Sequence, residues 1–211
     1  MKFLNTTQSI SILLFGILLL LPGILQAQIL LPIRADNRHS IQNLHITEIG
    51  QFGKVRKERV NIPSHLHTGI DIMRPVNNFN GEPIYPIAEG IVISKRTDGP
   101  YAQLIIEHYA NNLKFWTVYE HIAGITVHAG DRVSTNQKIA RFMNKEELNR
   151  YGWQFNHFHL EILKIKPKLL KTDPKNPERH YQSYTLVCYT PADLEKYFYD
   201  PIRFFKTNGV N

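Results

Sequence analysis

Residues 155–162 constrain the fold of this chain more than any other stretch. Their side chains alternate between a face with two histidines and a carboxylate and an apolar face. The first face comprises Phe155, His157, His159 and Glu161, and the second comprises Phe158, Leu160 and Ile162. This period of two predicts a β-strand with one buried face, on which neighbouring histidines stand ~7 Å apart. One histidine can then bind a metal while the other works beside it.

A His-x-His pair by itself more often marks an exposed edge strand than a site, so the rest of the chain must decide. Short β-branched and aromatic segments separated by Gly, Pro, Asn or Asp predict further strands. They cover residues 69–73, 84–88, 90–95, 104–108, 113–122, 125–128 and 138–143, with the last strand over 155–165. We therefore expect a mainly β fold built on antiparallel sheet.

Two short helices interrupt the predicted strands. Asn144 can cap a helix over residues 145–151, and Glu147 stands where it completes a capping box. Thr190 followed by Pro191 predicts a second helix over about 192–197. At 211 residues the chain suits one domain with a substantial core.

The N-terminal segment has the composition of a secretory signal. Lys2 is its only charge before Arg34, and residues 10–21 are almost unbroken aliphatic sequence. An apolar run this short predicts a signal peptide over residues 1–27, cleaved after Ala27, with an uncleaved anchor as the alternative. We therefore expect an exported protein of the periplasm or cell envelope, or a secreted one.

Cysteine content and charge narrow the class further. Cys188 is the only cysteine, so no internal disulfide can form, and a small buried residue is a better interpretation of it than a catalytic thiol. The formal net charge is +7. Basic residues gather in two groups, Lys54, Arg56, Lys57 and Arg59, then Lys164, Lys166, Lys168, Lys171 and Lys175. Such groups are usually solvated faces; if functional, they favour an anionic envelope surface, and export argues against nucleic acid.

A second histidine motif lies early in the predicted domain. His67 and Asp71 stand four residues apart on an extended segment, so both point to one side, and Gly69 between them leaves room for a third ligand. Zinc prefers nitrogen and oxygen donors of this kind, with one position kept for water in a catalytic site. One histidine of the His157/His159 pair can supply the third donor.

His121 ends a further predicted strand. Phe115, Thr117 and Tyr119 alternate up to it, and we expect His121 to share their face. Alone, such a histidine is more often structural than catalytic, but beside the other motifs it is the natural second unligated imidazole. His65 repeats the His-x-His spacing with His67, although its distance from Asp71 does not fit the motif. We interpret His65 as a neighbour of the site, in an outer-shell or substrate-contacting position.

Taken together, these motifs resemble the lysostaphin/LytM-type zinc endopeptidases of bacterial cell-wall metabolism, the duplicated hybrid motif peptidases. The resemblance covers roughly residues 44–164 and is carried by the segments 67–71, 83–90, 118–121, 127–131 and 157–161. It implies a compact antiparallel β sandwich with a groove over the metal and short helices at the rim and C-terminus. It also implies one Zn²⁺ per chain, with His67, Asp71 and His159 as ligands and with His121 and His157 as catalytic residues.

By this resemblance the chain is a zinc metalloendopeptidase that hydrolyses peptide bonds in peptidoglycan stem peptides or cross-bridges. Its domains are then a signal peptide (1–27), a linker (28–40), a LytM-like peptidase domain (41–166) and a C-terminal extension (167–211). The alternative is a non-catalytic LytM-like module that binds wall or activates an amidase. Such relatives commonly lack ligands, and this chain lacks none.

The chain departs from the family in two regions. The glycine-rich loop usual before the His-x-His strand is replaced by the predicted helix over 145–151, so the rim of the groove should differ. The chain also runs well past the usual end of the domain, and only residues 200–204 resemble a closing segment. Residues 167–199 are either a flap over the site or surface packing, and we favour packing because most added terminal sequence has no catalytic role.

Overall fold

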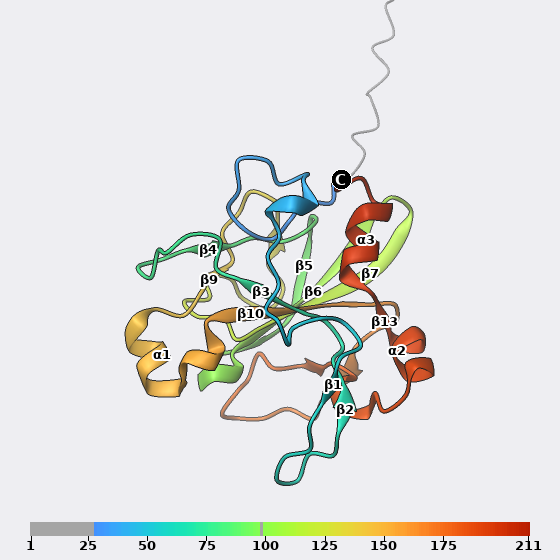
Figure 1. The fold of residues 1–211 in the computed structure, drawn as a ribbon. Coiled ribbons are helices and arrows are strands. Elements are labelled where there is room, and N and C mark those ends of the chain that lie inside the picture. Colours follow the sequence, from blue (N-terminus) through green and yellow to red (C-terminus); the bar gives the residue numbers. More distant parts are fainter. Residues whose placement is uncertain (1–27, 98) are drawn as a thin grey trace, which may run out of the picture.

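The computed structural model describes residues 28–97 and 99–211 (Figure 1). The predicted signal peptide therefore lies outside the described residues. Within them, the largest sheet has seven strands in the order β13-β10-β7-β6-β5-β8, with β3 also paired to β10, and every pairing is antiparallel. The mainly β, antiparallel fold expected from the sequence is confirmed.

The large sheet is made of strands of two to eight residues. They are β3 (Ile70–Met73), β5 (Gly90–Arg96), β6 (Gln103–Ala110), β7 (Leu113–Glu120), β8 (Arg132–Val133), β10 (His157–Leu163) and β13 (Phe198–Tyr199). Three two-stranded pairs accompany it: β1 (Val55–Arg56) with β2 (His65–Leu66), β4 (Pro83–Ile84) with β9 (Ala140–Arg141), and β11 (Lys168–Leu169) with β12 (Tyr181–Gln182).

Short helices lie around the sheet. They are α1 (Lys145–Tyr151), α2 (Pro191–Tyr197), α3 (Pro201–Thr207) and the 3₁₀ turns η1 (Ile41–Asn43), η2 (Gly99–Tyr101), η3 (Trp153–Phe155) and η4 (Thr185–Val187). The capping box of α1 is present as predicted, with Asn144 and Glu147 bonding each other's backbone N–H. α3 was not expected, although Asp200 caps it and Pro201 opens it, which is a usual helix start. No described helix has the length and apolar character needed to cross a membrane.

Strand β10 is the centre of the fold. One of its edges pairs with β7, while the other pairs first with β3 and then with β13. Its apolar face, with Leu160 and Ile162, joins the main hydrophobic core. Its second face carries the two histidines, Glu161 and Leu163. Leu163 packs in a second hydrophobic core that includes Cys188, Leu194 and Phe198.

One sequence interpretation needs correction, namely the linker over residues 28–40. Residues 29–33 are not a loosely held linker: the side chains of Ile29, Leu31 and Ile33 are buried in the main core, and Leu30 N donates to Ile87 O at 2.8 Å. At the other end, the extension contributes Phe204 and Phe205 of α3 to that same core and β13 to the large sheet. Figure 1 shows the C-terminus beside the first described segment, and Asn211 N donates to His39 O at 2.8 Å.

Several predicted strands are shorter than expected, and the segment 125–128 is not a strand. The first basic group includes Arg56 of the β1–β2 hairpin, which projects from the sheet in Figure 1. The shorter strands and the missing strand over 125–128 have one cause, which is the need for a pairing partner. Apolar residues predict burial, but a strand also needs a partner with matching backbone bonds.

Candidate metal centre

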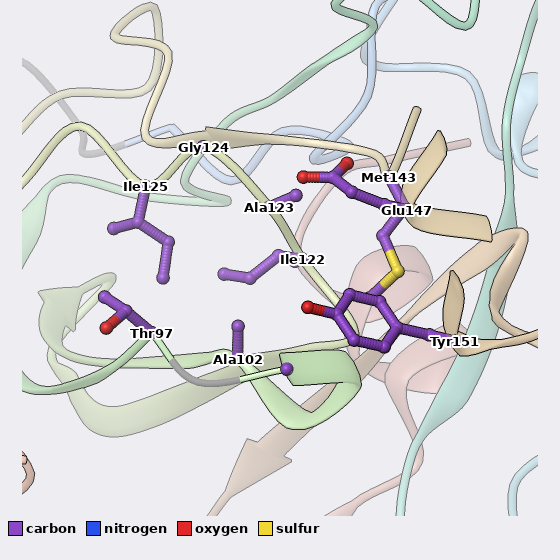
Figure 2. A pocket seen from close by; sticks show the side chains of 10 residues that line it. Thr97, Ala102, Ile122, Ala123, Gly124, Ile125, Met143, Glu147 and Tyr151 are labelled. Carbon is purple, nitrogen blue, oxygen red and sulfur yellow. The ribbon is translucent and has the colours of Figure 1, made fainter. Parts of the chain in front are cut away.

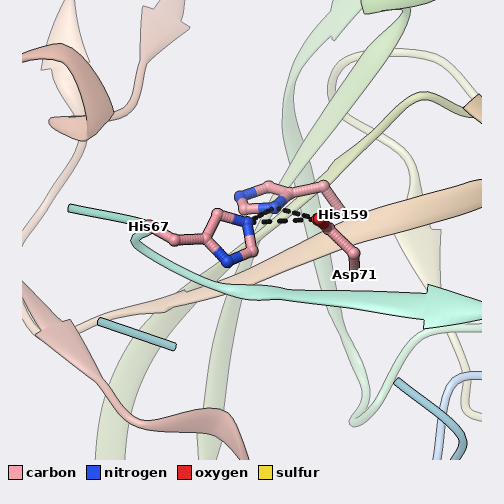
Figure 3. Close-up of side chains that lie close together, drawn as sticks. All are labelled: His67, Asp71 and His159. Atoms are coloured by element: carbon pink, nitrogen blue, oxygen red, sulfur yellow. Dashed lines mark hydrogen bonds and ion pairs between the residues drawn. The ribbon is translucent and has the colours of Figure 1, made fainter. Parts of the chain in front are cut away.

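Three side chains from the two histidine motifs converge on one point (Figure 3). His67 Nε2 lies 3.1 Å from Asp71 Oδ1, and His159 Nδ1 lies 3.0 Å from the same oxygen. The two nitrogens are 2.9 Å apart. All three residues are buried, with at most 6% exposure. This triangle of two nitrogens and one carboxylate oxygen is a donor set that zinc prefers.

The pairing of β3 with β10 creates this convergence. Asp71 stands directly opposite His159 in the antiparallel register, so their side chains emerge on the same face. Gly69 lets the strands approach, because a Cβ there would lie 2.8 Å from the carbonyl carbon of Leu160 and 2.9 Å from the His159 ring. His67, just before β3, can therefore reach across to His159.

Outer contacts orient both imidazoles toward the centre. His67 Nδ1 donates to Gln51 O at 3.0 Å, and His159 Nε2 donates to Glu161 Oε1 at 3.2 Å. Each bond leaves the other ring nitrogen facing Asp71 Oδ1. Because three electron-pair donors then face one another in a buried space, the residues fit a cation well.

The electrostatics of the group are strongly coupled. Burial opposes ionisation of Asp71, but the hydrogen bonds from His159 and His67 outweigh it and hold the pKa of Asp71 well below its ordinary value. Burial likewise opposes protonation of His159, yet bonds to Asp71 and Glu161 raise its pKa to about 10. Burial lowers the pKa of His67. Without a metal, the ionised Asp71 is thus paired with a protonated His159, and a bound cation would take the place of the His159 proton on Nδ1.

The two histidines predicted to be catalytic lie beside the triangle. His157 Nε2 is 3.7 Å from Asp71 Oδ1, and its ring meets that of His121 edge-on, with centroids 5.4 Å apart. Burial lowers the pKa of each to about 4. Both are therefore neutral near pH 7 and able to accept a proton.

His121 reaches this position by leaving its strand. β7 ends at Glu120, and in its register Tyr119 pairs with Leu160, on the apolar face, while Glu120 pairs with His159. The expectation that His121 continues the face of Tyr119 is wrong, because His121 has φ +62° and turns toward His157 instead. His121 Nδ1 donates to Pro100 O at 2.6 Å, which leaves Nε2 as the proton-accepting atom.

Aromatic rings flank His121, and a small cavity is lined by the residues that follow it in the chain. Its ring packs against Phe155 and Tyr101, with centroids 4.8 and 5.6 Å away. A cavity of about 110 Å³ is lined by Ile122 and Ala102, among other residues. These two residues directly follow His121 and Tyr101 in the sequence. Figure 2 shows the Tyr151 hydroxyl turned into this space. The cavity has room for a small group, and two of the residues that line it are chain neighbours of His121 and Tyr101.

Arg56 is a member of the centre that sequence reasoning missed. Its Nη2 donates to Asp71 Oδ2 at 2.6 Å and its Nη1 to Ile49 O at 2.9 Å. Arg56 thus points inward, whereas the sequence grouped it with residues facing an anionic surface. The carboxylate of Asp71 is left with one oxygen, Oδ1, for the histidines. Nothing in the local sequence distinguishes Arg56 from the other basic residues of the hairpin.

His65 is not a member of the triangle but stands opposite Arg56, which bonds Asp71. Its Nδ1 lies 2.9 Å from Pro63 O. Glu161 has a larger part than expected, because it is 1% exposed and lies directly behind His159. Its place on the histidine face of the predicted strand was the available signal.

Comparison with known protein families matches the part of the chain that contains these histidines. Residues 65–177, more than half of the chain, match the model of peptidase family M23. A search of curated proteins finds no match.

Among solved structures, the chain is similar to the antimicrobial peptidase lysostaphin from Staphylococcus simulans, with 17% identity, 81% of this chain and 54% of that chain covered, and a TM-score of 0.49. It is similar to a zinc containing peptidase from Vibrio cholerae, with 28% identity, coverage of 64% and 37%, and a TM-score of 0.44. It is also similar to a chain of the SpoIIIAH and SpoIIQ complex, with 20% identity, coverage of 65% and 92%, and a TM-score of 0.45. The chain thus spans only about half of lysostaphin and less of the Vibrio cholerae peptidase.

Proposed function

This chain belongs to peptidase family M23, and from that membership and the geometry of its centre we propose that it is an exported zinc endopeptidase acting on peptidoglycan. The observation that carries the proposal is the convergence of His67, Asp71 and His159 with two neutral histidines beside them. His67, Asp71 and His159 would hold one Zn²⁺. When bound, zinc supplies a Lewis acid that polarises the scissile carbonyl and acidifies a water molecule.

The protein's own residues then handle the protons. His157 and His121 are neutral because burial lowers the pKa of both, so either can accept a proton from the attacking water. The protonated imidazole can afterwards stabilise the developing oxyanion or protonate the leaving amine. The bond from His121 Nδ1 to Pro100 O fixes that ring with Nε2 as its reactive atom.

The surroundings of the two histidines suggest how a peptide would lie. Tyr101 and Phe155 form an aromatic border at His121, and the cavity lined by Ala102 and Ile122 is large enough for a small side chain. We place one residue of the bound peptide in this cavity. The substrate class is peptidoglycan stem peptide or cross-bridge, which implies export, since this polymer lies outside the cytoplasmic membrane.

The decisive experiment measures metal content and wall digestion on one preparation of the purified chain. Peptidoglycans with direct and with glycine-bridged cross-links are incubated with and without a chelator, and the released fragments are identified by mass. We expect about one zinc per chain and chelator-sensitive release of peptides. A zinc-free protein that cleaves neither wall would overturn the proposal and favour a non-catalytic module that binds wall or activates an amidase.

A further inference from the structure

The carboxylate of Glu161 is the link between the metal centre and the C-terminal part of the chain. Its Oε1 accepts the Nε2–H of His159 at 3.2 Å, on the side of the ring away from Asp71. The geometry of this bond decides which nitrogen of His159 faces the centre. Any group that orients Glu161 therefore also orients His159.

Three hydroxyl groups hold Glu161 in place. Thr68 Oγ1 and Thr185 Oγ1 each donate to Oε1 at 2.5 Å, and Ser183 Oγ donates to Oε2. Together with His159, four donors therefore bond this carboxylate, three of them at Oε1 and one at Oε2. A buried carboxylate held through both oxygens in this way has little freedom to rotate.

Two of the three hydroxyls come from a segment that the family match does not reach. The match ends at residue 177, whereas Ser183 and Thr185 follow β12 and begin η4. Their hydroxyls also lie 3.1 Å from each other, and Thr185 Oγ1 lies 3.3 Å from Thr68 Oγ1. The cluster therefore joins the early His67 motif, the β10 strand and the C-terminal extension.

The backbone on both sides of these residues is anchored. Before them, His180 N and Tyr181 N both donate to Ser94 Oγ, at 3.0 and 3.1 Å. After them, Leu66 N donates to Cys188 O at 2.8 Å, which ties the segment to the strand that leads into His67. The positions of the two hydroxyls are thus set by contacts with β5 and β2 rather than by an exposed loop.

We infer that Ser183 and Thr185 are positioning residues of the metal centre, which fix Glu161 and through it the metal-binding orientation of His159. The inference rests on the proposed function, because it takes His159 as a metal ligand. It assigns a role to residues 183–185 of the C-terminal extension that surface packing would not require.

The test is the zinc affinity of a Ser183→Ala/Thr185→Val variant, measured by competition with a chromophoric chelator. We expect the dissociation constant to rise about 10- to 100-fold, the range usual for loss of outer-shell partners. The single variant Thr185→Ser keeps the hydroxyl and should therefore keep most of the wild-type zinc affinity. Tyr184→Phe is the matched control, because it removes a hydroxyl between the two positions that bonds Lys166 O and not Glu161.

A double-mutant cycle with Glu161→Gln separates positioning from general destabilisation. If Ser183 and Thr185 act through Glu161, their replacement should weaken zinc binding much less in the Glu161→Gln background than in the wild type. Additive losses, or an unchanged affinity of the Ser183→Ala/Thr185→Val variant, would overturn the inference while leaving the metal centre intact. A wild-type protein that binds no zinc would instead overturn the proposed function.

Discussion

His121 has a backbone conformation that residues with side chains rarely adopt. Its φ of +62° lies in the left-handed region, which is unfavourable without compensating contacts. The contacts present here are the bond to Pro100 O and the packing against Phe155 and Tyr101. A strained conformation held by several contacts, directed at a candidate metal centre, is consistent with a catalytic role for this histidine.

The different positions of His121 and His67 lead to a first prediction. His121→Ala should retain zinc but lose roughly 100- to 10,000-fold in kcat/KM, because it removes a proton-transfer group and no ligand. His67→Ala should lose both zinc and activity. Zinc content and peptide release from peptidoglycan, measured on the same samples, check this, with circular dichroism as the control for folding. Full hydrolysis by His121→Ala would rule out the role assigned to it.

His108 is a buried histidine outside the centre. Its Nδ1 donates to Glu89 O at 2.9 Å, its Nε2 lies 2.8 Å from Thr117 Oγ1, and it is 1% exposed. Burial lowers its pKa to about 4. The folded protein thus keeps His108 neutral, whereas the unfolded chain protonates it near its ordinary pKa.

The pKa of His108 predicts part of the acid sensitivity of the fold. Because the folded pKa is depressed, its contribution is fully present above about pH 6.5 and is lost as the pH falls toward about 4. Between about pH 7.5 and 4.5 this one group should lower the free energy of unfolding by about 2–3 kcal/mol. In His108→Gln, urea unfolding should show a pH dependence smaller by that amount. An identical pH dependence in both proteins would contradict the assignment.

At the scale of elements, the contact between β3 and β10 forms the centre. Asp71 and His159 face each other because the two strands pair in one register, and a slip by one residue would turn every side chain to the opposite face. Gly69 is the point at which this contact has no room for a side chain. The spacing of His67, Gly69 and Asp71 thus has a packing reason as well as a chemical one.

Gly69→Ala should therefore damage stability and zinc binding together. Its methyl group would meet the Leu160 backbone and the His159 ring, and forcing the strands apart should lower the free energy of unfolding by about 1–3 kcal/mol. Urea unfolding with chelator present measures the first effect, and zinc competition measures the second. Gly81→Ala is a suitable comparison, because a Cβ there meets nothing within 4 Å, although its φ of +156° brings strain of its own. Unchanged zinc affinity in Gly69→Ala would show that the close approach is not needed.

At the scale of the whole molecule, the two ends of the described chain complete one core. Leu31 and Ile33 from the first segment and Phe205 and Val210 from the last are each at most 1% exposed and pack in the same cluster as Leu160. The peptidase-family match covers neither end. The described residues therefore form a single folded unit that is larger than the matched region.

Leu31→Ala tests this integration. Removing a fully buried leucine side chain should lower the free energy of unfolding by about 2–5 kcal/mol, whereas a true linker would tolerate the change. Zinc affinity of the folded variant should stay near that of the wild type, because Leu31 lies outside the centre. Chemical unfolding measures the stability of Leu31→Ala. Leu186→Ala is the control, because the Leu186 side chain is 56% exposed. Equal stability of both variants would restore the linker interpretation.

The sequence by itself determined the class of fold, the helix α1 with its cap and the residues that meet at the centre. These features depend on local periodicity, on a capping motif a few residues long and on donor types that only a few metals prefer. His67 and Asp71 could be named from their donor chemistry and spacing, whereas the choice of His159 over His157 came from the family resemblance. Their roles in binding and catalysis remain predictions for the experiments above.

Only the tertiary structure decided how His121 turns toward His157, that Arg56 bonds Asp71, and that Ser183 and Thr185 hold Glu161. The hydrogen bonds of Arg56, Ser183 and Thr185 join residues 15 or more positions apart in the sequence. The turn at His121 is local, but its direction depends on contacts with Pro100 and Phe155. A lone arginine, serine or threonine has no distinctive pattern in a sequence, because many positions tolerate it. The partner that gives it a function is set by strand register and by the packing of the chain ends, which are properties of the whole fold.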